Sequence, residues 1–128
     1  MGKLMVSGLL AAALAFMSAS AHAGPWEDGM AAYNRGDYVP AIAVFRGMAR
    51  AGNAKAQGML GAMYQRGQGV AKSAPHAFMW LTMAASRGDA QAKVELKTVS
   101  AAMTPDELTQ ARAMMQACAV SDYRDCQY

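Results

Sequence analysis

Apolar residues recur at helical spacing in two stretches that lie 36 residues apart. The first set is Ala41, Val44, Phe45, Met48 and Ala49. The second set is Ala77, Trp80, Leu81, Ala84 and Ala85. Both follow the i, i+3, i+4, i+7, i+8 spacing of one face of an amphipathic helix. The pattern therefore predicts two equivalent helices within an internal repeat.

The residues that follow these stripes repeat at the same offset. Gly52-Asn53 comes after the first stripe and Gly88-Asp89 after the second. Glycine is suited to ending a helix in the left-handed conformation, and Asn or Asp is suited to capping the next one. Each repeat is therefore expected to pass directly from one helix into another.

A second series of helices precedes these two, and its members differ in how they end. Residues 33–36 resemble residues 64–67, which lie 31 residues further along, but residues 68–72 are inserted after the later copy. Asp37 and Ser73 each fit the N-cap of the following helix, with Pro40 and Pro75 in its first turn. The five inserted residues thus mark a loop between two helices.

The last part of the chain predicts a third, modified unit. A weaker stripe is formed by Ala92, Leu96, Val99 and Met103. Thr104-Pro105-Asp106-Glu107 is a capping-box start, and its helix is expected to bury Leu108, Ala111, Met115 and Cys118. We expect an all-α fold without strands: a short right-handed α-solenoid of three antiparallel helix pairs over residues 24–121, followed by a tail at 122–128.

The central segment resembles the Sel-one-like repeat, a relative of the tetratricopeptide repeat. The resemblance is fullest from Ala54 to about Ala92, while Trp26 to Asn53 is a looser version. The residues that carry it are Leu60, Gly61, Tyr64, Gly67, Gly69, Val70, Ala77, Trp80, Leu81, Ala84, Ala85 and Gly88. The resemblance implies an α-solenoid that binds other proteins, and it implies no catalytic activity.

The first 23 residues have the pattern of a secretory signal peptide. An apolar run follows Lys3, and Ala21-His22-Ala23 supplies the small-residue motif for cleavage between Ala23 and Gly24. An uncleaved anchor is the alternative, but the run is shorter than the ~20 residues that a membrane span needs. We expect a periplasmic or secreted protein with no stable membrane anchor after cleavage.

The two cysteines, Cys118 and Cys126, are interpreted in the light of export. An even pair in an oxidising compartment favours a disulfide, which would tie the tail to the last helix. A redox pair is the alternative, although the spacing is not that of C-x-x-C. The net charge of +3, or +2 without Lys3, gives no indication of a nucleic-acid partner.

Several other motifs have a structural explanation beside a functional one. Lys72-Ser73 suggests a phosphate-binding loop, but Arg66 stands where its first glycine should be and no strand precedes it. The chain has 12 methionines, which could hold copper(I) but are also flexible core residues. Arginines before glycines suggest a basic groove, or merely cations at helix C-termini.

The sequence therefore favours a monomeric scaffold that binds an unidentified protein or peptide, with no cofactor, metal site or catalytic residue. Copper handling is the alternative, and a hydrolase is less favoured because residues 24–128 contain one histidine, His76, and no G-x-S-x-G or H-E-x-x-H motif. The candidate binding residues, on the first helix of each pair, are Tyr33, Asn34, Gln57 and Gln65.

Overall fold

The computed structural model describes residues 2, 24–122 and 126, and within them the chain is entirely helical. The six helices are α1 (Pro25–Asn34), α2 (Tyr38–Arg50), α3 (Ala54–Arg66), α4 (Ala74–Ser86), α5 (Ala90–Ala102) and α6 (Pro105–Val120). The all-α prediction is confirmed. The expected signal peptide, Gly2 apart, and most of the expected tail lie outside the described residues. No helix within the described part is long and apolar enough to cross a membrane.

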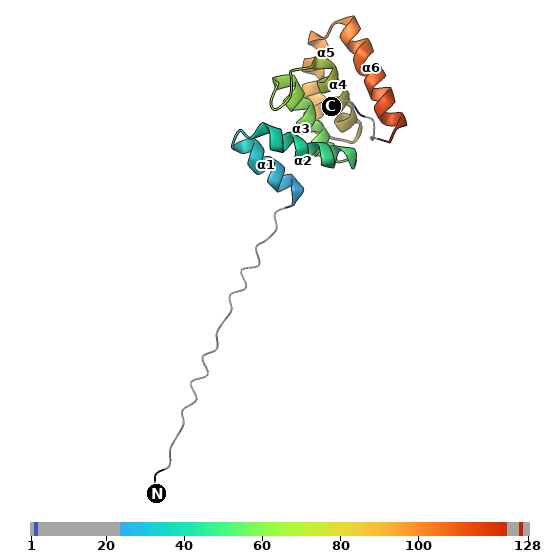
Figure 1. Cartoon of the computed structure of the whole chain (residues 1–128). Coiled ribbons are helices and arrows are strands. Elements are labelled where there is room, and N and C mark those ends of the chain that lie inside the picture. The colour runs from blue at the N-terminus through green and yellow to red at the C-terminus, as the bar shows by residue number, and fades with distance from the viewer. Residues whose placement is uncertain (1, 3–23, 123–125, 127–128) are drawn as a thin grey trace.

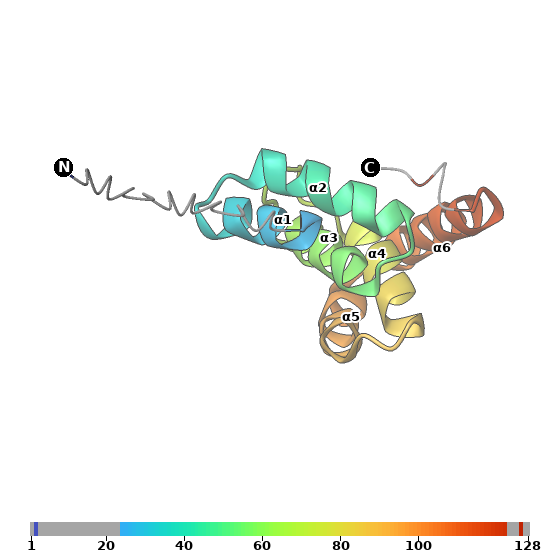
Figure 2. The same ribbon diagram turned by 90° about the horizontal axis from the view of Figure 1, so that it is seen from below.

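Successive helices pack side by side from α1 through α5 (Figures 1 and 2). The sixth helix departs from this order, because α6 packs mainly on α4 and makes no comparable contact with α5. The last two helices therefore do not repeat the packing of α1 on α2 and of α3 on α4. As a result, α4 is in contact with three helices, α3, α5 and α6.

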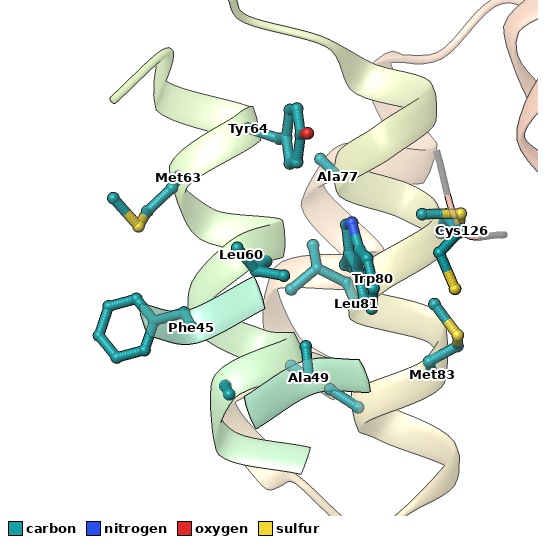
Figure 3. Close-up of a cluster of buried hydrophobic side chains, with 14 of the residues drawn as sticks. Phe45, Ala49, Leu60, Met63, Tyr64, Ala77, Trp80, Leu81, Met83 and Cys126 are labelled. Carbon is teal, nitrogen blue, oxygen red and sulfur yellow. The ribbon is translucent and has the colours of Figure 1, made fainter. Parts of the chain in front are cut away.

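The central position of α4 explains its composition. A helix that contacts three neighbours has little surface left for polar residues, and α4 buries Ala77, Met79, Trp80, Leu81, Met83 and Ala84. Trp80 and Leu81 lie with Leu60 of α3 in the close-up of the core (Figure 3). Burial of one large apolar side chain contributes about 1.5–3 kcal/mol, so this helix organises the fold.

Short-range caps define most helix boundaries. Asn53, Ser73 and Asp89 each accept a backbone N–H from the first turn of the next helix, as predicted. Thr104 and Glu107 form the predicted capping box at the start of α6. Asp37 occupies the N-cap position of α2 without capping it, because its Oδ2 accepts instead from Arg35 Nε at 3.1 Å.

The five-residue insertion lies against the first helix pair. Gly67 ends α3 in the left-handed conformation with φ of 68°, and Gly69 has φ of 72°. A Cβ on Gly69 would lie 2.8 Å from the carbonyl carbon and oxygen of Tyr38, and Val70 packs against the core. The loop thus joins the second repeat to the beginning of α2.

Cys118 and Cys126 form a disulfide, as predicted, and both are buried. Cys118 Sγ lies 3.7 Å from Met83 Sδ, and Figure 3 shows Met83 and Cys126 at the same edge of α4. The bond therefore fastens residue 126 to α6 where that helix packs on α4.

Candidate binding groove

A groove runs between α3 and α5 and begins at the first turn of α1. One part of it is a cavity of about 270 Å³ with an apolar floor. The floor is formed by Met59, Ala62, Leu81 and Ala92. A cavity of this kind can accept one large apolar side chain. We call it, together with its continuation described below, the α3/α5 groove.

Trp26 closes one end of the groove. Its ring packs on Phe45 of α2, with ring centroids 5.4 Å apart and a tilt of 51°. Lys55 of α3 places its Nζ 5.9 Å from the centroid of the same ring, within the range of a cation–π contact. The indole is held between an apolar neighbour and a cation and remains half-buried at the groove.

The two walls of the groove differ in charge. Lys55 and Arg66 line it from α3, whereas Asp89 and Glu95 line it from the α5 side. Glu95 Oε1 accepts from Gln91 Nε2 at 3.1 Å, while its Oε2 is buried and accepts no hydrogen bond from the described residues. The groove thus offers a buried acceptor beside an apolar floor.

The groove continues along α3 and α5 past Arg66. A second hollow shares Arg66, Gln91 and Glu95 with the first and adds Gln65, Lys72 and Val94 to the lining. A third shares Gln65, Lys72 and Thr98 with the second and reaches Ala102 near the end of α5. The continuous surface is long enough to follow both helices, and so suits an elongated ligand better than a compact one.

Of the four candidate residues chosen from the sequence, Gln65 lines this groove. Tyr33 instead takes part in internal contacts: its hydroxyl donates to Gln68 Oε1 at 3.2 Å and accepts from Arg66 Nη1 at 3.3 Å. Asn34 is exposed at the last position of α1, away from the groove lining. The structure therefore does not bring the four candidates together.

Gln57, the remaining candidate binding residue, is buried in the structure. The side chain has no exposed surface, and its Nε2 donates to the carbonyl oxygen of Ala49 at 3.2 Å. Ala49 lies in the last turn of α2, where carbonyl groups lack partners within the helix. Gln57 thus joins α3 to the end of α2 and presents no atom to a partner.

Sequence reasoning missed Trp26, Lys55, Met59 and Glu95 as groove residues. Trp26 stands at the start of the looser version of the repeat, and Met59 has no neighbouring motif that indicates a binding role. The available signal was an aromatic residue in the first turn of α1 together with charged positions on α3 and α5. These positions come together only when the helices are stacked, and no local sequence pattern indicates that they share one groove.

The methionines in the described part of the chain lie in the core or pack against it. Met63, Met79, Met83 and Met114 are buried, and Met59 is half-buried in the groove floor. Among the residues that the structure describes, no group of three or more His, Cys, Asp or Glu side chains could hold a metal ion. The placement of these thioethers is that of flexible packing residues.

Comparison with known protein families matches residues 54–89 to the Sel1 repeat. The match spans α3, the inserted loop and α4, and it supports the resemblance drawn from the sequence. Sel1 repeats generally mediate protein–protein interaction, and proteins that carry them as interaction modules are typically non-catalytic. A search of curated proteins gave no match.

Proposed function

We propose that this protein is an exported, non-catalytic scaffold that binds a protein or peptide of the cell envelope in the α3/α5 groove. In this proposal the helices stack as a short right-handed solenoid, and α1, α3 and α5 supply its binding face. The chain acts as a monomer with a single binding face. The observation that carries the proposal is the apolar floor at Met59 and Leu81, bounded by charged walls and closed at one end by Trp26.

Export is supported by two features of the sequence and structure. Residues 1–23 have the order of a signal peptide, with cleavage between Ala23 and Gly24. The Cys118–Cys126 disulfide is typical of proteins that fold in an oxidising compartment. N-terminal sequencing of the protein recovered from a periplasmic or secreted fraction would test this; a mature chain that retains residues 1–23 would contradict it.

Site-specific photo-crosslinking tests the groove as the binding surface. A photoreactive residue is introduced at Gln91, which is exposed on the groove wall, and at Arg112, which is exposed on α6. We expect irradiation of cells to yield a discrete crosslinked protein from position 91 and none from position 112. Trp26→Ala in the position-91 variant should abolish that product. Equal crosslinking from both positions, or none from 91, would rule out the groove.

A further inference from the structure

A second, separate cavity lies where the inserted loop meets the start of α4. It has a volume of about 230 Å³ and is lined by Arg46 of α2, Tyr64 of α3, and Ser73 and His76 at the start of α4, with Val70 and Ala71 of the loop. It shares no lining residue with the α3/α5 groove. The function proposed for the α3/α5 groove therefore does not account for the polar side chains of this cavity.

The position of the proton on His76 follows from the helix cap. Ser73 Oγ accepts the backbone N–H of His76 at 3.4 Å and lies 2.7 Å from His76 Nδ1. The Ser73 hydroxyl has a single proton, which it can donate to Nδ1 in the tautomer that leaves this nitrogen unprotonated. When Ser73 donates to Nδ1, the neutral ring carries its own proton on Nε2, and Nε2 is then a donor.

The other two polar side chains also present donors. Arg46 Nη2 donates to Tyr64 Oη at 3.4 Å, so the Tyr64 hydroxyl accepts that bond and keeps its own proton to give. The Tyr64 ring is stacked on His76, with centroids 4.7 Å apart and an angle of 19°, which holds both groups at one site. None of the described residues that line the cavity is acidic.

We propose that this cavity binds a carboxylate group. A planar guanidinium matches the two oxygens of a carboxylate, and the phenol and imidazole supply two more donors. The cavity adjoins the N-terminus of α4, whose partial positive charge favours an anion in the same place. The volume suits one carboxylate on a short stem, such as a free small acid or the end of a peptide.

Carboxylate binding should be linked to protonation of His76. Burial and then the nearby charge of Arg46 lower the pKa of His76. The ionisable side chains that line the cavity with it are Arg46 and Tyr64, and neither α5 nor α6 contributes a described lining residue. An anion beside the ring would oppose the effect of Arg46 and raise the pKa, so binding should tighten as the pH falls.

NMR titration of the histidine C–H signals in the full chain tests this proposal, with sodium acetate as the probe and sodium chloride at equal ionic strength as the control. His76→Gln identifies the His76 signal against that of His22. We expect acetate to raise the pKa of His76 in a saturable manner that chloride does not reproduce. No saturable change would overturn the site, and an equal response to inorganic phosphate would overturn the carboxylate assignment.

Two variants test which side chains bind acetate, and a third variant is the control. Arg46→Gln should weaken acetate binding about tenfold, as expected for loss of a charged hydrogen-bond donor. Tyr64→Phe keeps the ring stacked on His76 and should weaken binding by a smaller factor. Arg66→Gln, which removes a cation from the other groove, should leave acetate binding unchanged. If Arg46→Gln fails to fold, Tyr64→Phe still decides: unaltered affinity in that variant would contradict the proposed donor set.

Discussion

The backbone of Gly61 in α3 rests directly on Leu81 of α4. A Cβ on Gly61 would lie 2.5 Å from Leu81 Cγ and 3.2 Å from the Leu81 backbone nitrogen. Neither atom can move away without shifting α4, since Leu81 is fully buried. The distance between the two central helices is therefore set by the absence of a side chain at position 61.

Gly61→Ala should destabilise the protein by about 1–3 kcal/mol, the usual cost of overpacking a core. Gly47→Ala is the matched control, because Gly47 lies inside α2 and a Cβ there would contact nothing within 4 Å. That substitution should stabilise the helix by about 0.5–1 kcal/mol. Thermal or urea unfolding measures both changes, and equal effects of the two substitutions would show that Leu81 does not fix the spacing.

Gly69→Ala should cost more stability than Gly36→Ala. Both glycines have positive φ, 72° and 80°, so alanine should lose about 1–2 kcal/mol at either position. A Cβ on Gly36 contacts nothing, whereas one on Gly69 would meet the Tyr38 backbone. We expect about 1–3 kcal/mol of additional loss at Gly69. Urea unfolding of the two variants checks this, and equal losses would mean that the loop does not bear on α2.

Removing the disulfide through the double substitution Cys118→Ala and Cys126→Ala should lower the free energy of unfolding by about 2–3 kcal/mol. This is the expected value for a closed loop of this length. Because both sulfurs are buried, a mild reductant should open the bond in the native protein slowly. Thiol labelling with and without urea measures the rates, and rapid reduction without urea would contradict the buried position.

The lowered pKa of His76 makes stability depend on pH. The unfolded chain, with a histidine pKa near 6.5, binds a proton before the folded chain does. Stability should therefore fall as the pH drops from about 6.5 through the lower pKa of the folded state. His76→Gln should flatten the dependence between about pH 7 and pH 5.5. Urea unfolding over this range measures it, and an unchanged slope would assign the effect to other groups.

Local chemistry explains which parts of the fold the sequence predicts well. Asn53, Asp89 and Thr104 cap their helices through residues three positions away, so the spacing along the chain contains the whole interaction. The disulfide is similarly local, because its two cysteines are eight positions apart in the sequence. Boundaries of this kind need no knowledge of the neighbouring helices.

Features that depend on stacked helices were not predictable. The sequence placed Met115 on the buried face of α6, yet Met114 is the more deeply buried of the two, because α6 packs on α4 and not on α5. Trp26, Lys55 and Glu95 come from three different helices, and their convergence requires the arrangement of all three. The binding surface was therefore less accessible to sequence reasoning than the helices that form it.

The hydrogen bond from Gln57 to Ala49 has a consequence for building larger proteins from this repeat. The buried amide of Gln57 keeps its acceptor only if α3 begins at a fixed position relative to the end of α2. A shift of α3 by one residue would leave the buried donor without an acceptor. The segment 54–89 therefore cannot be transferred into another protein as an independent unit. Grafting it into an artificial array would require the last turn of α2 to be transplanted along with it.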